Sequence, residues 1–504
     1  MNKPLRFRLG VGALVLVLAG CAVGPQYQRP ATDVPASFKE ASMSPEAAKR
    51  WKEAQPADSM ERGRWWTIFQ DARLNDLEEQ AMVANQDLKA AAARVAQARA
   101  LTRNARSELF PRVDAGFGPT RQRASNASQG LPEDASNAPL TLWRAQASVS
   151  YEADLFGRVA SQVDAATASA QQSQALYRSV LLALQADVAQ AYFLVRRLDG
   201  EKALYDDTVE LRKQTLELIE RRYVEGDISE LDVARARTEL DSARSQSLGV
   251  DRQRAIAEHA LAILMGKPPA DFGLKVQPLG QVAVGIPAGL PSSLLERRPD
   301  IAAAERAMAA ANARIGAAKA AFFPRLSITG TAGFESAQLG DLFEWSSRAF
   351  LLGPFVGTML SLPIFDGGQR QAGLDRARAE YEEDVAIYRQ TVLNAFREVE
   401  DNLSSLRILG SQTQVQETAV QSAARAAQLS QIQYREGSTS YLDVIDADRA
   451  VLQQKSAAVL LYGERAQAAV NLIRAIGGGW GTVIPDVTTL ATDTVGRYSP
   501  KFNQ

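Results

Sequence analysis

The chain contains two copies of one unit, and this duplication constrains its fold more than any other feature of the sequence. A constant shift of 211 residues aligns identical residues over about ninety positions, and a shift of 213 does so further upstream. At the first shift the aligned pairs are Tyr177 and Tyr388, Tyr223 and Tyr434, Glu225-Gly226 and Glu436-Gly437, Ser229 and Ser440, Asp232 and Asp443, and Gly266 and Gly477. At the second shift Phe110-Pro111-Arg112 aligns with Phe323-Pro324-Arg325. A repeated unit has to be found before a fold is assigned, so we divide the chain into repeat 1 at 85–297 and repeat 2 at 298–480.

Each repeat is predicted to contain two long helices separated by a short break. The stretches 156–225 and 227–265 in repeat 1, and 367–436 and 438–476 in repeat 2, are interrupted at Glu-Gly. A helix of about 70 residues would be roughly 100 Å long, and no single globular core buries such a length. Apolar residues recur at three- to four-residue spacing between charged ones, so we expect these helices to pack along one another as coiled coils.

Short alternating segments precede the long helices in each repeat. The clearest runs from Ala145 to Leu155, where apolar and polar residues alternate strictly, and 325–334 repeats the pattern; 112–118 and 350–364 are weaker candidates. Such alternation predicts strands with one apolar and one polar face, with the length of transmembrane strands or of a soluble sandwich. Four strands cannot close a membrane barrel, and an open edge in lipid leaves costly unpaired backbone groups. If the strands span a membrane, several chains must share one barrel.

The first residues have the pattern of a secretory signal peptide. Lys3, Arg6 and Arg8 precede a short apolar stretch that ends in Leu18-Ala19-Gly20-Cys21. A basic start, a short hydrophobic core and small residues before a cleavage site are typical of such a signal. The LAGC sequence resembles the bacterial lipobox, which implies removal of 1–20 and lipid attachment at Cys21. Ala22 follows, where an aspartate would resemble an inner-membrane retention signal, so the outer membrane is favoured.

The composition argues against catalysis, metal binding and nucleic-acid binding. The 504 residues include 57 basic and 58 acidic ones, which gives a net charge of −1 and no excess of base for phosphate contacts. Cys21 is the one cysteine and His259 the one histidine, so neither a thiolate cluster nor a histidine-rich metal site is possible. His259 lies in an alanine-rich helical stretch and is interpreted as a residue on a helix face. We therefore predict no enzyme, no catalytic residue, no metal and no cofactor apart from the covalent lipid.

At this point the sequence resembles the TolC-like outer membrane factors, specifically the NodT-type lipoproteins of drug-efflux systems. The resemblance covers essentially the whole mature chain. It includes CAVGPQYQRP, WWTIFQDARLNDLEEQAMVANQDL, YEADLFGR, LPSSLLERRPDIAAAERAMAAANARIGAAKAAFFPRLSITG, YVEGDISELDV and YREGSTSYLDVIDADR. Together these strings are specific, although none of them would be so alone.

The resemblance implies a mainly α protein whose chains form a homotrimer. Three chains would share a twelve-stranded transmembrane β-barrel and continue as a long α-helical coiled-coil barrel. An equatorial belt would be built from roughly 50–84, 270–297 and the tail 481–504, so 21–84 carries both the lipid and part of the belt. The implied partners are a periplasmic membrane fusion adaptor protein, an inner-membrane RND pump and outer-membrane lipid. No nucleic acid is expected.

The resemblance also assigns a periplasmic gate and adaptor contacts to the two hairpin tips. The gate residues are Tyr434, Asp443 and Asp446, with Asp232 as a partner on the neighbouring hairpin. The adaptor contacts are Tyr223, Gly226 and Gly437. Thr439 stands where some members of the family carry a gate-linking arginine, so the resemblance leaves open which bonds hold this gate closed.

The residues themselves give an independent reason to consider two of these aspartates. Asp443 and Asp446 are three positions apart and so lie on the same side of a helix. Threefold symmetry would gather their carboxylates into rings that favour cations. A solvated helix face, or a helix cap after the Gly turn, remains an alternative for both.

The predicted function is a passive exit duct for drugs and other toxic small molecules, energised by its partners. The alternatives are a duct for type I secretion of polypeptides, a constitutive diffusion porin and a periplasmic tether without a pore. A porin needs neither long periplasmic helices nor a gate, and a tether does not need the alternating strands.

Overall fold

A computed structural model describes residues 23–31, 34–35, 38–40, 63–130, 132–280, 297–352 and 358–478. The predicted signal peptide 1–20, Cys21 and the tail 481–504 lie outside the described residues. The chain forms two compact units. Unit 1 comprises Met1–Ala31, Val95–Ser173 and Ala304–Tyr388, and unit 2 comprises Thr32–Arg94, Gln174–Ala303 and Arg389–Gln504. Each repeat contributes residues to both units, so the units do not coincide with the repeats.

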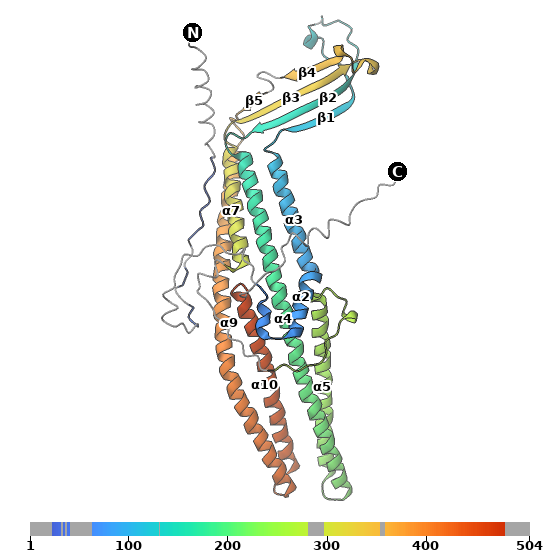
Figure 1. Cartoon of the computed structure of the whole chain (residues 1–504), viewed down its shortest axis with the longest axis vertical. Helices are drawn as coiled ribbons and strands as arrows, with labels where there is room; N and C mark the ends of the chain where they lie inside the picture. Colours follow the sequence, from blue (N-terminus) through green and yellow to red (C-terminus); the bar gives the residue numbers. More distant parts are fainter. Residues whose placement is uncertain are drawn as a thin grey trace. The chain divides into compact units, whose positions relative to one another are not determined.

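Unit 1 contains one antiparallel sheet with strand order β1-β2-β3-β4, shown in Figure 1. The strands are β1 (Arg112–Gln122), β2 (Leu140–Ala153), β3 (Arg325–Ser336), β4 (Arg348–Leu352) and β5 (Thr358–Ser361). The predicted strand 350–364 is present as β4 and β5, which pair with successive stretches of β3. β2 begins before the predicted start at 145 and ends before the predicted end at 155, whereas β1 extends past 118.

The register of the strands separates two faces of this sheet. Val113, Val149 and Gly330 lie opposite one another, and so do Phe117, Ala145 and Phe334. Because side chains alternate along a strand, the intervening residues are on the other face. That face carries serine, threonine and glutamine, and one ion pair of 2.6 Å joins Arg144 and Glu335 across β2 and β3.

Long helices make up most of the described chain (Figure 1). Repeat 1 contains α3 (Gln86–Ser107), α4 (Arg158–Val224) and α5 (Glu230–Leu264), and repeat 2 contains the corresponding α7 (Pro299–Ala320), α9 (Gln369–Arg435) and α10 (Tyr441–Ala475). α4 and α9 are each 67 residues long, and α5 and α10 are each 35 residues long. Each pair forms an antiparallel hairpin. No helix within the described part of the chain has the length and apolar character to cross a membrane.

The N-terminal segment 23–31 packs against the helices of unit 1. The Asn312 side chain of α7 donates a hydrogen bond of 2.9 Å to the carbonyl oxygen of Pro25. Arg29 donates one of 3.0 Å to the Tyr388 hydroxyl on α9 and lies 3.8 Å from the Glu305 carboxylate on α7. Gly24 contacts Gly316 so closely that a Cβ on Gly24 would lie 3.0 Å from the Gly316 Cα. Segment 23–31 therefore has a defined place near the strand-proximal end of α7.

The first helices of unit 2 among the described residues are η2 (Trp65–Phe69) and α2 (Ala72–Ala84), and the Trp65 indole N–H donates a hydrogen bond of 3.0 Å to Gln185 of α4. Asp71 caps α2 by accepting hydrogen bonds from the backbone N–H groups of Arg73 and Leu74. The other Asp71 carboxylate oxygen accepts one of 2.6 Å from the Tyr192 hydroxyl on α4. Since η2 and α2 lie within the predicted belt segment 50–84, these contacts attach that part of the segment to α4.

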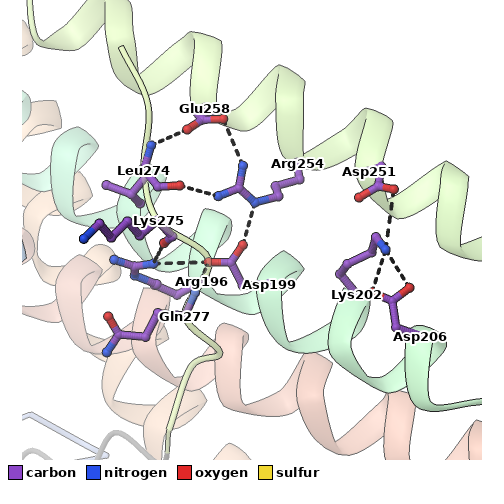
Figure 2. A network of polar contacts seen from close by, with 10 residues as sticks. All are labelled: Arg196, Asp199, Lys202, Asp206, Asp251, Arg254, Glu258, Leu274, Lys275 and Gln277. Carbon is purple, nitrogen blue, oxygen red and sulfur yellow. Dashed lines mark hydrogen bonds and ion pairs between the residues drawn. The ribbon is translucent and has the colours of Figure 1, made fainter.

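The segment that follows α5 is fixed to α4 and α5 by a network of charged groups (Figure 2). Asp199 of α4 is fully buried, and its carboxylate accepts hydrogen bonds from Arg254 at 2.6 Å and from the Gln277 backbone N–H at 2.9 Å. Arg254 also donates to Glu258 and to the carbonyl oxygen of Leu274. A buried carboxylate is stable only with such partners, so the network holds this chain segment in one position along the hairpin.

Candidate functional site

The two hairpin tips, 225–229 and 436–440, end their helices in the same way. Gly226 and Gly437 have φ of 83° and 73°, in the left-handed region that glycine adopts without steric cost. In both turns the glycine N–H donates to the carbonyl oxygen of the aligned tyrosine, Tyr223 or Tyr434, at 3.0 Å. The N–H of the residue after the glycine donates to the carbonyl oxygen of the residue before that tyrosine, and the two bonds together form a Schellman motif. The Glu-Gly pairs in the sequence therefore correspond to two equivalent, ordered turns.

The carboxylate of Asp443 is hydrogen-bonded to the residues that precede α10. It accepts hydrogen bonds from the Thr439 hydroxyl at 2.6 Å, from the Ser440 hydroxyl at 2.7 Å and from the Ser440 backbone N–H at 3.0 Å. These bonds lower the pKa of Asp443, with the Thr439 hydroxyl making the largest contribution. Ser440 and Asp443 form a capping box, and Thr439, which stands where some family members carry a gate-linking arginine, donates a further hydrogen bond to the same carboxylate.

Asp232 has the equivalent place in the first hairpin. Its carboxylate accepts a hydrogen bond of 3.1 Å from Ser229, the N-cap of α5, and lies 3.5 Å from Arg235. The duplicated Ser-x-x-Asp sequence therefore produces two similar helix starts. Asp446 is different, because its side chain is 62% exposed and lies 3.4 Å from Arg449 one turn along α10.

Tyr434 lies between the two hairpins. Its ring contacts that of Tyr441, with centroids 5.6 Å apart, and the Arg222 guanidinium of α4 lies 5.4 Å from its centroid. Burial raises the pKa of Tyr434, and Arg222 opposes this change while Asp232 adds to it. Within the described residues the Tyr434 hydroxyl has no hydrogen-bond partner. Asp232, predicted as a partner of the gate residues on the neighbouring hairpin, is therefore near Tyr434 but is not hydrogen-bonded to it.

An apolar cluster joins the two tips. Ile219 of α4 and Ala236 of α5 are buried together with Tyr441, Val444 and Ile445 of α10. Tyr223, one of the predicted adaptor contacts, is 43% exposed, and the neighbouring Val224 is 85% exposed. The tips thus have a buried seam between the hairpins and an apolar outer surface on the first one.

Sequence reasoning missed a group of charged residues above the cluster. Glu239 of α5 is 7% exposed and lies 2.9 Å from Arg212 of α4. Its carboxylate also accepts a hydrogen bond of 3.0 Å from Nε of Arg449 on α10. Half-buried Asp448 lies nearby, and burial raises its pKa. Nothing in the sequence distinguishes these charges from others on the helices, because the pairing joins residues 210 positions apart.

The fold and the tips together define a class of protein. Antiparallel strands and one long helical hairpin in each repeat, with an ordered turn at the end of each hairpin, are the features of an outer membrane efflux channel subunit. The sequence matches the family described as outer membrane efflux protein over residues 77–267 and 290–478. The chain belongs to this family, and its location is the outer membrane. The predicted family is therefore confirmed, and it is a family of efflux proteins, not of enzymes.

The chain is similar over most of its length to several named outer membrane efflux proteins. The antibiotic efflux pump outer membrane protein ArpC of Pseudomonas putida is 35% identical over 488 residues, covering 95% of this chain and 96% of ArpC. The toluene efflux pump outer membrane protein TtgC of Pseudomonas putida has the same identity and coverage. The open-state MtrE outer membrane channel of Neisseria gonorrhoeae is 29% identical, with a TM-score of 0.77 and coverage of 91% of this chain and 98% of MtrE.

Proposed function

We propose that this chain forms, as a homotrimer, the exit duct of a tripartite efflux pump. The duct conducts drugs and other toxic small organic molecules from an inner-membrane RND pump and a periplasmic adaptor to the outside. Its periplasmic end is closed at the hairpin tips and opens when the partners engage. ArpC and TtgC are designated antibiotic and toluene efflux components, which supports amphipathic organic molecules as substrates.

The observation that carries this proposal is the incompleteness of the sheet in a single chain. Its two faces differ, with Val113 and Phe117 of the apolar face 69% and 65% exposed. The strand order begins with β1 and ends with β4, so each outermost strand has one edge without a neighbour among the described strands. An exposed apolar face suits lipid, and edges in lipid require pairing. Copies of the chain that pair β1 with the β4–β5 edge of the next copy satisfy both requirements.

Exposed apolar residues on the helices support the same assembly. Ile408, Val415 and Leu429 of α9 are 51%, 70% and 43% exposed, and they are spaced at multiples of seven residues. Ile256 and Ile263 of α5, also seven apart, are 58% and 62% exposed. A heptad stripe is the usual signature of a helix partner, so α9 and α5 are suited to pack on neighbouring chains.

We also propose that lipid on Cys21 anchors the chain. Gly24 follows Cys21 by three residues and is held against Gly316 of α7 and near Ser161 of α4. Both helices meet the sheet a few residues away, since β2 ends at Ala153 and β3 begins at Arg325. Segment 23–31 therefore leads the predicted lipid-bearing residue toward the level at which the strands would enter the membrane. Cys21→Ser should abolish incorporation of labelled palmitate, and retained label would exclude this anchor.

Deletion of the gene tests the function. The deletion strain should become more susceptible to amphipathic antibiotics and solvents, and the wild-type gene should restore resistance. Cross-linking of the purified protein should give trimers. Unchanged susceptibility together with loss of a secreted polypeptide would favour the type I secretion alternative. A large constitutive conductance of the wild-type protein in planar bilayers would favour the porin alternative.

A further inference from the structure

Glu239 has an unusual set of partners, because one buried carboxylate receives two arginines from different helices. Arg212 donates a hydrogen bond of 2.7 Å to the Glu239 carbonyl oxygen and lies 2.9 Å from its carboxylate. Arg449 donates to the other carboxylate oxygen. Arg212 and Glu239 belong to the first hairpin, α4–α5, whereas Arg449 belongs to the second, α9–α10. The Glu239–Arg449 pair is thus an ionic contact between the two hairpins of one chain.

This contact lies at a place where apolar packing between the hairpins is interrupted. The apolar cluster of the tips ends near Ala236 and Ile445. Beyond it, a cavity of about 420 Å³ has a mainly polar lining that includes Arg212, Glu239 and Arg449, with Tyr205 and Leu452 as its larger apolar members. A cavity reduces dispersion contacts, and the Glu239–Arg449 ion pair provides a direct attraction between the hairpins beside it.

The contact is not a product of the duplication. At the shift of 211 residues Arg212 aligns with Ala423, Glu239 with Ala450, and Arg449 with Thr238. The second hairpin therefore has alanines where the first has the charged pair, and the first has a threonine where the second has the arginine. The three charges are a specific feature of the hairpin contact, whereas the tip turns and capping aspartates are shared by both repeats.

The arrangement suits a contact that breaks and forms again. Removing one member of a buried ion pair is costly because it leaves a charge without a partner. If the second hairpin moves away, Glu239 keeps Arg212, and Arg449 keeps Asp446, which is already 3.4 Å away on its own helix. Neither charge is left alone, so separation costs only the contact itself.

We propose that Glu239 and Arg449 form a latch that holds the two hairpins of each chain together in the closed duct, and that Arg212 is the positioning residue that keeps Glu239 paired when the latch opens. The proposal rests on the proposed function, because it assumes that the tips close a channel. The bond that opening must break is then the one between Glu239 and Arg449, which connects the two hairpins directly, and not a bond of the tip aspartates.

Conductance of the purified protein in planar bilayers tests the latch. Arg449→Gln should raise the open probability by about tenfold, which corresponds to about 1.4 kcal/mol. Glu239→Gln should do the same, and the double variant should open no further than either single one. Arg212→Gln should not raise conductance, because Arg449 would then be the remaining partner of Glu239 and would hold it more firmly. This difference between two arginines on one carboxylate is not expected of general destabilisation.

Arg237→Gln is the matched control. Arg237 forms an ion pair of 2.8 Å with Glu220 that joins α4 to α5 within the first hairpin, near the same tip. It should leave the conductance unchanged. Wild-type conductance in Arg449→Gln, or equal increases in Arg449→Gln and Arg237→Gln, would overturn the latch. Arg449 is 55% exposed, so its replacement should not prevent folding. Because these measurements need no export, failure of the wild-type gene to restore drug resistance would overturn the proposed function separately.

Discussion

Arg298 donates a hydrogen bond of 3.0 Å to the main-chain carbonyl oxygen of Ala475, and so joins the beginning of α7 to the end of α10. The first repeat contains the equivalent bond, since Asn85, which precedes α3, donates one of 3.1 Å to the carbonyl oxygen of Leu264 at the end of α5. In each repeat a side chain just before one helix thus binds a carbonyl oxygen at the end of another helix, but only in repeat 2 is that side chain charged. Arg298 also binds the carboxylates of Asp300 and Glu398, each at 2.6 Å.

Because Arg298 is charged and Asn85 is not, replacing these two aligned residues should lower the unfolding free energy by different amounts. Arg298→Gln leaves two carboxylates without their cation, and because Asp300 and Glu398 are partly exposed the loss should be about 2 to 3 kcal/mol of unfolding free energy. Asn85→Ala removes neutral hydrogen bonds and should cost about 1 kcal/mol. Thermal unfolding of the purified protein measures both. Arg73→Gln, which breaks an exposed pair with Asp76, should have almost no effect. Equal losses for Arg298→Gln and Asn85→Ala would contradict this interpretation.

Glu78 predicts a dependence of stability on pH. It is fully buried on α2, its carboxylate oxygens have no hydrogen-bond partner in the described chain, and burial raises its pKa well above the ordinary value. Above the ordinary carboxyl pKa the folded state therefore keeps a proton that the unfolded state releases, so the unfolding free energy falls as pH rises. Glu78→Leu should raise the melting temperature, and the increase should be larger at pH 8 than at pH 5. Exposed Glu79 provides the control, since Glu79→Gln should leave the melting temperature unchanged at both pH 5 and pH 8. A Glu78→Leu difference that does not vary with pH would contradict the assignment.

The sequence predicts those parts of the fold that depend on local patterns. The alternation from Ala145 to Leu155 identified β2, and the Glu-Gly pairs identified both tips, because period-two alternation and a left-handed glycine are properties of a few adjacent residues. The Ser440-x-x-Asp443 cap is equally local, and it was left open as an alternative to a gate role. The remaining gate and adaptor assignments depend on other chains and stay predictions.

Contacts between distant parts of the chain could not be predicted in this way. Nothing near Arg449 in the sequence specifies Glu239, since many charged residues lie on the same helices. The place of Gly24 against Gly316 likewise depends on two glycines in otherwise ordinary contexts. The two compact units also differ from the two repeats, because α4 and α9 each contribute residues to both units. Pairing and packing of this kind require the three-dimensional arrangement.

The contact between Gly24 and Gly316 predicts that a larger residue on α7 displaces segment 23–31. A Cβ on Gly316 would lie 2.8 Å from the Ser161 hydroxyl oxygen and 3.2 Å from the Gly24 Cα. Gly316→Val should therefore expose Tyr27, whose hydroxyl is buried in the wild type, and permit chymotryptic cleavage after it, measured by the mass of the released N-terminal fragment. Gly410→Val is the matched control on α9, where a Cβ meets nothing within 4 Å. Protection of Tyr27 in both variants would show that the glycine contact does not hold the segment.

The two tip aspartates of α10 should behave differently when each is replaced. Asp443 is bonded to Thr439 and Ser440, so Asp443→Ala should increase amide hydrogen exchange several-fold at the first turn of α10. Because these bonds lower its pKa, the cap is present above the ordinary carboxyl value and is lost as pH falls through the lowered one. The wild-type tip should accordingly exchange like Asp443→Ala at low pH. Exposed Asp446 makes no cap, so Asp446→Ala should leave this exchange unchanged and reduce the cation preference of the duct in bilayers. Increased exchange in Asp446→Ala, or unchanged exchange in Asp443→Ala, would reverse the two roles.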